Sequence, residues 1–199
     1  MARRKRFASP ECLFHVVNRG NDRRTVFHRD ADFSAFLALL RSAGGKFPVH
    51  VFGYCAMPNH FHLLVRPEEA SALSAYMQWV TCRYACDLRR RTDTVGHGHV
   101  FQRRFWSTPV HDQLGLLTVL RYIEANPVRA RLVDRAEDWL WSSLRDRRRQ
   151  EPGIVRALPV GLPANWDDLV NFRQRDEVLK AIRDALVAKR GRPACSNSH

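Results

Sequence analysis

The tripeptide His60-Phe61-His62 lies in an apolar run that is typical of a β-strand, and it restricts the fold more than any other feature of the sequence. Side chains alternate between the two faces of a strand, so His60 and His62 point to one face and Phe61 points to the other. Two imidazoles side by side on a rigid face can hold one divalent metal ion. We therefore expect a sheet that carries half of a metal site.

The apolar pattern predicts a mixed order of strands and helices. Strands are expected at residues 12–18, 49–57, 60–66 and 100–105, and helices at residues 30–45, 71–88 and 112–126. Pro58-Asn59 joins the second and third strands into a hairpin. The order β-α-β-β-α-β, followed by a helix, is the ferredoxin-like split βαβ arrangement. This is an α+β fold with an antiparallel sheet and helices on one face.

The chain is long enough for one domain with its own core, because 45% of its 199 residues are hydrophobic. We assign residues 1–150 to this domain, with a basic N-terminal arm. Residues 151–199 are a C-terminal extension packed on the domain, with one amphipathic helix expected at residues 176–190. The five cysteines show no disulfide framework, and no apolar run reaches membrane-spanning length. We therefore expect a cytoplasmic protein without membrane association.

The charge of the chain favours a polyanionic partner. Lys and Arg number 33 against 20 Asp and Glu, which gives a formal net charge of +13. Such an excess indicates nucleic acid as the simplest partner. The basic residues cluster, and the 101–106 segment combines arginines with aromatic residues, which suits single strands. The same segment is equally well explained as a core strand with solvated arginines.

The helix expected at residues 112–126 could supply the other half of the site. Tyr122 and Asn126 lie four residues apart on one edge of its apolar stripe, where side chains can leave the core and enter a cleft. The Asn126 carbonyl oxygen could complete a site for a hard cation, and the Tyr122 phenol could attack phosphorus. We interpret His15, in the first strand, as an ordinary strand residue.

These residues carry a resemblance to a known family. His60-Phe61-His62 fits the HUH motif, and the segment from Tyr122 to Ala130 (Tyr-Ile-Glu-Ala-Asn-Pro-Val-Arg-Ala) resembles the nucleophile helix of single-tyrosine HUH transposases. The blocks Asn18-Arg19-Gly20-Asn21, Met57-Pro58-Asn59-His60, Gly98-His99-Val100-Phe101-Gln102 and Trp139-Leu140-Trp141-Ser142-Ser143 occur in family order. The resemblance is narrower to the REP-associated tyrosine transposases (RAYTs), and it covers roughly residues 11–145.

The resemblance implies an enzyme that cuts single-stranded DNA near a hairpin and forms a 5′-phosphotyrosine. Tyr122 would be the nucleophile, and His60, His62 and Asn126 would bind Mg²⁺ or Mn²⁺. Relatives often carry histidine at the position of Glu124, which is either an auxiliary group of the metal site or the frayed end of the helix. Transposases of the wider group act as dimers, but the RAYT resemblance favours a monomer. The expected DNA contacts are Arg3, Arg4, Lys5, Arg6, Arg19, Arg103 and Arg104.

Two other functions remain possible from the sequence. A domesticated relative could bind palindromic DNA without cutting it, although His60, His62 and Tyr122 are all present. A ferredoxin-like RNA-binding protein would instead expose aromatic residues at the centre of its sheet.

Overall fold

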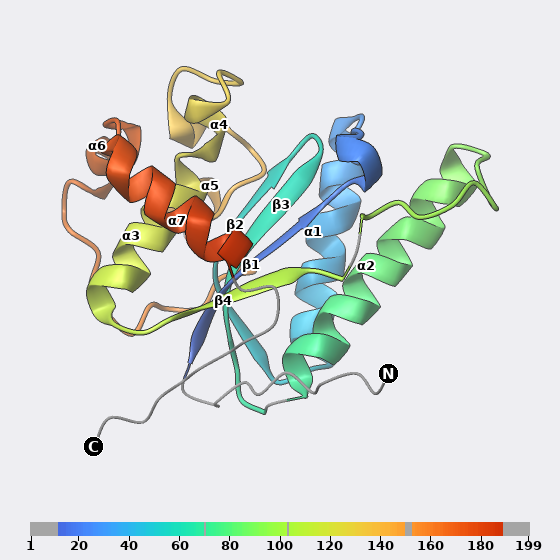
Figure 1. Cartoon of the computed structure of the whole chain (residues 1–199), viewed down its shortest axis with the longest axis horizontal. Helices are drawn as coiled ribbons and strands as arrows, with labels where there is room; N and C mark the ends of the chain where they lie inside the picture. Colours follow the sequence, from blue (N-terminus) through green and yellow to red (C-terminus); the bar gives the residue numbers. More distant parts are fainter. Residues whose placement is uncertain (1–11, 70, 103, 150–152, 189–199) are drawn as a thin grey trace.

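The computed structural model describes residues 12–69, 71–102, 104–149 and 153–188 (Figure 1). Its centre is a four-stranded antiparallel sheet in the order β2-β3-β1-β4. The strands are β1 (Leu13–Arg19), β2 (Val49–Met57), β3 (His60–Pro67) and β4 (Trp106–Val110). This order is that of a split βαβ unit, so the predicted α+β fold class is confirmed.

Helices α1 (Asp30–Gly44) and α2 (Ala72–Arg91) cover one face of the sheet, on the right in Figure 1. The apolar stripe predicted for α2 is buried, and it packs with α1 on the odd-numbered side chains of β3, among them Phe61 and Leu63. Alternation along the strand leaves His60, His62 and Leu64 on the opposite face.

The opposite face is covered as well, so the helices are not confined to one side of the sheet. Helix α3 (Gln113–Glu124) packs there with α5 (Ser143–Arg148), and the short elements α4 (Asn126–Arg129) and η2 (Ala136–Asp138) complete this part of the chain. The short element η1 (Asn21–Arg23) follows β1 and lies near α1 instead. Strands β2 and β3 direct the apolar side chains of Phe52, Cys55 and Leu64 toward this face. They are buried in a second core with Leu116 and Leu120 of α3, which keeps them from solvent.

The C-terminal extension contains two helices where the sequence predicted one. Helix α6 (Trp166–Asn171) was not expected, and α7 (Asp176–Ala188) agrees with the amphipathic pattern. Trp166 of α6 and Leu179 of α7 are buried in the second core, so both helices pack on the sheet-bearing part of the chain. No helix among the described residues is long and apolar enough to cross a membrane.

The fourth strand lies later in the chain than predicted. The described residues of the 100–105 segment form only a single bridge, between Phe101 and Gly20, and β4 begins at Trp106. Phe101 and Phe105 are apolar because they fill the first core from a loop, so the core explanation of this segment is confirmed for them. Pro109 is compatible with β4 because an edge strand leaves one row of backbone groups unpaired.

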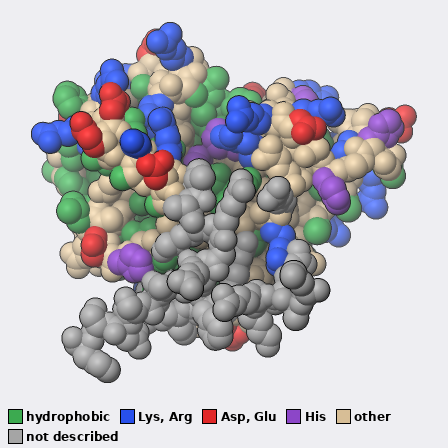
Figure 2. Space-filling view, viewed as in Figure 1, with side chains coloured by type: hydrophobic (Ala, Val, Ile, Leu, Met, Phe, Trp, Pro, Cys, Tyr) green, Lys and Arg blue, Asp and Glu red, His purple; other side chains and the backbone are tan. Residues whose placement is uncertain are grey.

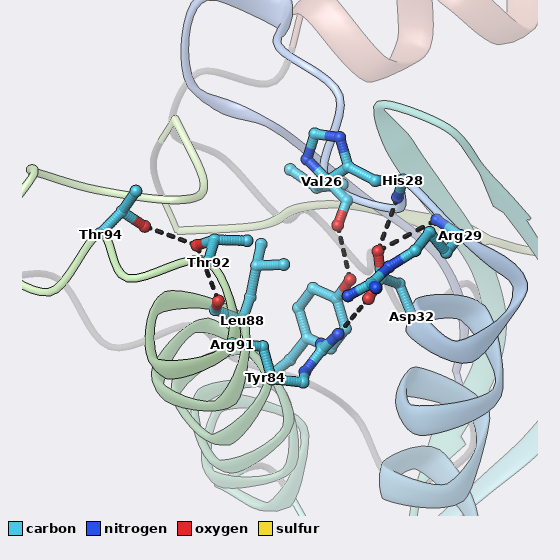
Figure 3. A network of polar contacts seen from close by, with 9 residues as sticks. All are labelled: Val26, His28, Arg29, Asp32, Tyr84, Leu88, Arg91, Thr92 and Thr94. Atoms are coloured by element: carbon cyan, nitrogen blue, oxygen red, sulfur yellow. Dashed lines mark hydrogen bonds and ion pairs between the residues drawn. The ribbon is translucent and has the colours of Figure 1, made fainter.

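A polar network fixes the loop that precedes α1 (Figure 3). The Tyr84 hydroxyl donates to the Val26 carbonyl at 2.5 Å, and the buried Asp32 carboxylate forms an ion pair with Arg91 and accepts two backbone N–H groups from the residues before the helix. The backbone N–H of Val26 in turn donates to the carbonyl of Pro58 at 2.8 Å. The network therefore supports the β2–β3 turn, which leads directly into His60.

Gly53 allows α3 to lie close to the sheet. A Cβ atom at this position would be 2.4 Å from Cδ1 of the fully buried Leu120. We expect Gly53→Ala to lower the free energy of unfolding by about 1–3 kcal/mol, because overpacking a filled core forces side chains or backbone to shift. Urea denaturation measures this effect. Gly44→Ala is the matched control, since its Cβ would have no neighbour within 4 Å, and equal losses in both variants would contradict the packing argument.

Candidate active site

Strand β3 presents His60 and His62 on the face that α3 covers. Their ring centroids lie 5.0 Å apart with an interplanar angle of 78°. His62 lies opposite Val17 of β1 and Cys55 of β2, near the middle of the sheet, and only 3% of it is exposed. His60 lies at the start of the strand and is half-buried. The alternation predicted from the sequence therefore places both imidazoles side by side.

Each of these histidines has one ring nitrogen already engaged. His60 Nδ1 is 2.6 Å from Asn59 Oδ1, and His62 Nδ1 is 2.9 Å from His15 Nε2. Because an amide oxygen only accepts, His60 must donate through Nδ1, which leaves the lone pair on its Nε2. If His62 likewise donates to His15, the free nitrogen of both His60 and His62 is Nε2. Hydrogen bonds of this kind orient histidine ligands in metal sites.

His15 was interpreted as an ordinary strand residue, and this interpretation was wrong. Its ring stacks on His62 at 5.1 Å, and its edge contacts Tyr122 at 5.8 Å. The proximity of His15 to His62 could have been predicted from the sheet topology. In a split βαβ sheet β1 and β3 are neighbours, and His15 shares a strand face with Arg19, which pairs with His60.

Burial keeps the three imidazoles neutral. Desolvation lowers the pKa of His15 to about 3 and that of His60 to about 4, and the positive charge of Arg129 acts on both in the same direction. For His62, burial first and then the neighbouring histidines and arginines hold the pKa well below its ordinary value. A neutral imidazole is the form that binds metal ions, so burial leaves these histidines in the protonation state that a metal ligand needs.

Helix α3 brings Tyr122 to the histidines. The helix begins after Asp112, whose carboxylate accepts the backbone N–H of Gly115 at 2.6 Å and caps the N-terminus. Ten residues later the Tyr122 ring lies with its centroid 5.7 Å from that of His62. Only 6% of Tyr122 is exposed, so its ring belongs to the interior of the site.

Asn126 is close to this group in the sequence, but its side chain is engaged elsewhere. It begins α4, its Oδ1 accepts from Nη2 of Arg129 at 2.6 Å, and its Nδ2 donates to the carbonyl of Ile123 at 3.2 Å. Across the described part of the chain, no three His, Cys, Asp or Glu side chains form a group that could hold a metal ion. The third ligand therefore stays a prediction. To bind a metal through Oδ1, Asn126 would have to give up the hydrogen bond from Arg129.

Glu124 is neither a frayed helix end nor exposed to solvent. It is fully buried, and both carboxylate oxygens are engaged by residues that follow α3. Oε1 accepts from Ser143 at 2.5 Å and from Arg147 at 3.2 Å, and Oε2 accepts from Trp166 Nε1 at 2.8 Å. These contacts join α3 to α5 and α6, so the carboxylate holds helices together.

Most of the predicted DNA contacts lie outside the described residues, namely Arg3, Arg4, Lys5, Arg6 and Arg103. Of the others, Arg104 is exposed and Arg19 is half-buried, and Arg19 shares a strand pair with His60. Figure 2 shows Lys and Arg side chains on both halves of one face of the molecule, with histidine between them.

Comparison with known proteins identifies the family of this chain. Residues 8–126 match the sequence family described as IS200-like transposases, which is more than half of the chain. The chain therefore belongs to the IS200-like transposase family.

Within this family the resemblance to REP-associated tyrosine transposases is confirmed. The chain is 27% identical over 128 residues to a protein of Haemophilus influenzae assigned as one, and the match covers 60% of this chain and 73% of that protein. A solved REP-associated tyrosine transposase bound to a REP hairpin shares the fold, with a TM-score of 0.59 and 19% identity over 82% of this chain and 95% of that one.

Proposed function

We propose that this protein is a single-strand DNA endonuclease and strand transferase that acts through a 5′-phosphotyrosine. The observation that carries the proposal is the placement of Tyr122 from α3 against His62, next to His60 on the same sheet face. A tyrosine beside two neutral imidazoles on a rigid sheet is suited to phosphoryl transfer at a metal ion. The excess of basic residues favours a polyanionic substrate.

The reaction exchanges one phosphoester bond for another. The Tyr122 hydroxyl oxygen forms a bond to the phosphorus and loses its proton to water, and the bond from phosphorus to the 3′-oxygen breaks. The 3′-oxygen leaves as the end of the departing strand and takes up a proton from water. Because the phosphotyrosine ester conserves the bond energy, a free 3′-hydroxyl can later attack it and rejoin a strand.

The residues present fit a divalent metal, with Mg²⁺ or Mn²⁺ as the proposed ion. His60 and His62 are neutral, adjacent and oriented through their Nδ1 atoms, which leaves one nitrogen of each for coordination. Asn126 is the proposed third ligand. A metal bound there would neutralise charge on the phosphoryl group and on the departing oxygen. The part that the chain itself performs is to hold the imidazoles and the Tyr122 ring on one face.

The proposed substrate is single-stranded DNA that carries a hairpin of palindromic repeats. The support is the structural neighbour, which is bound to a REP hairpin. Arg19, Arg104 and the basic residues of the N-terminal arm would contact phosphates. We propose that the protein acts in the cytoplasm and as a monomer.

Incubation with a panel of single-stranded hairpin oligonucleotides in Mn²⁺ tests the proposal. The expected result is a protein–DNA adduct that survives a denaturing gel, together with a released fragment ending in a 3′-hydroxyl. A gel shift without any adduct would instead identify a protein that binds palindromes but does not cut them. Competition by RNA as effective as that by DNA hairpins would favour the RNA-binding alternative.

Removal of one HUH histidine should abolish the reaction but leave the fold intact. We expect His60→Ala to slow adduct formation more than the roughly 10–100-fold that loss of an outer-sphere partner costs, because it deletes a ligand. His60 is half-buried at the end of a turn, so circular dichroism should stay unchanged. His50→Ala removes another strand histidine, one that pairs with Glu68, and serves as the control. Wild-type rates in His60→Ala at every metal concentration would exclude the metal role.

A further inference from the structure

Arg129 is a largely buried cation to which the described residues offer no acidic partner. Its Nη1 atom is buried and has no hydrogen-bond acceptor, and its Nη2 donates to the neutral amide oxygen of Asn126. Within the described ranges, no carboxylate forms an ion pair with it, whereas the other deeply placed arginine of this region, Arg147, is paired with Glu124. A buried charge of this kind is costly unless it is paired, so the position is suited to an anion.

The guanidinium lies against the nucleophile. Its central carbon is 4.0 Å from the centroid of the Tyr122 ring. The Tyr122 ring centroid in turn lies 5.7 Å from that of His62 and 5.8 Å from that of His15. The Arg129 guanidinium is therefore separated from the histidines only by the tyrosine ring.

The groups that act on the charge of Arg129 include no carboxylate. Burial lowers the pKa of the Arg129 guanidinium, Tyr122 and Cys55 raise it, and the charge of Arg183 on α7 lowers it. Arg19, beside His60, adds another cation to this end of the sheet. The missing negative charge must therefore come from a ligand.

We propose that Arg129 Nη1 binds a non-bridging oxygen of the phosphate that Tyr122 attacks, an inference that rests on the proposed function. A guanidinium presents a planar set of donors that matches phosphate oxygens, and in a buried site such a bond is strong. Because Nη1 is the free donor, the contact with the phosphate does not require the bond between Nη2 and Asn126 to break.

A purely structural role for Arg129 makes a different prediction. If the residue only holds Asn126 at the start of α4, then its loss should affect every substrate equally and should not depend on any single phosphate. This structural role does not account for the buried, unpaired Nη1 atom of Arg129. The two roles can therefore be separated by changing the charge of one phosphate at a time.

The experiment measures binding of hairpin oligonucleotides in the Tyr122→Phe background, where no bond is cut. A neutral methylphosphonate replaces each phosphate in turn, and the cut position is mapped separately with Tyr122 intact. We expect Arg129→Gln to lower affinity about tenfold or more. We also expect the slope of log affinity against log salt to fall by about 0.7, as for one phosphate contact. In this variant the methylphosphonate at the cut position should no longer weaken binding.

Arg131→Gln is the matched control, because it removes an equal charge from an exposed residue two positions away. Arg129→Lys keeps the charge and should retain part of the affinity, and it replaces the Gln variant if that protein does not fold. Undiminished sensitivity to the methylphosphonate at the cut position in Arg129→Gln or Arg129→Lys would overturn the proposal.

The outcomes also separate this inference from the proposed function. Binding without any adduct would refute the cleavage activity, and a single phosphate whose effect depends on Arg129 would still support the anion site. If no oligonucleotide binds, then the DNA function fails, and inorganic phosphate becomes the probe. Phosphate should then raise the melting temperature of the wild type more than that of Arg129→Gln at equal ionic strength. Equal shifts would refute the anion site.

Discussion

Tyr122→Phe is expected to abolish covalent adduct formation and to leave hairpin binding within about twofold of the wild type. The substitution removes the attacking oxygen, and deletion of a nucleophile from a concerted group of catalytic residues costs more than about 10³-fold in rate. The phenyl ring keeps the contact with the Arg129 guanidinium and with the His62 ring, so the site should stay packed. A denaturing gel measures the adduct, and a native gel shift measures binding.

The control for this variant is another buried tyrosine. Tyr54 lies in β2 on the opposite face of the sheet, in the core that packs against α1 and α2. Tyr54→Phe should therefore cleave like the wild type. If Tyr122→Phe still formed the adduct at the wild-type rate, then another nucleophile would be at work and the proposed mechanism would be wrong.

Glu124→Ala is expected to produce the largest loss of stability, about 3–5 kcal/mol in the free energy of unfolding. The substitution leaves the Arg147 guanidinium and the Trp166 indole N–H without their acceptor inside the second core. Urea denaturation followed by tryptophan fluorescence measures the loss. Glu124→Gln should be milder, since an amide oxygen can still accept one of these hydrogen bonds.

Glu177→Ala is the control for this second prediction, because Glu177 is an exposed acid in the first turn of α7. The same pair of variants tests the other interpretation of Glu124. An auxiliary role at the metal would give a Glu124→Ala protein of normal stability whose cleavage needs more Mn²⁺, and that result would contradict the structural role.

The elements that the sequence predicted well are those whose apolar pattern is local. The stripe from Leu73 to Leu88 and the capping residue Asp112 identified α2 and α3, because packing of one face against one core determines them. Alternation in β3 likewise gave the orientation of His60 and His62. The split βαβ order then followed from the sequence of strands and helices.

The elements that were missed depend on partners far away in the chain. Phe101 and Phe105 are buried although they lie in a loop, so their apolar pattern looks like that of a strand. The true strand β4 contains a proline, which argues against a strand in the sequence but is tolerated at the edge of the sheet. Helix α6 is too short for a periodic signal. The roles of His15 and Glu124 arise from contacts with His62 and Trp166, more than 40 residues away in each case.

The attachment of α3 to the segment around α6 predicts how the activity of this protein depends on its concentration. Beyond the Glu124–Trp166 bond, Arg121 donates to the carbonyl of Phe172 at 2.8 Å, so the segment around α6 holds the C-terminal end of the tyrosine helix. We expect a helix held in this way to stay with the sheet of its own chain and not to pack on the sheet of a neighbouring molecule. We expect each molecule to carry a full set of reacting groups, so that specific activity stays constant on dilution.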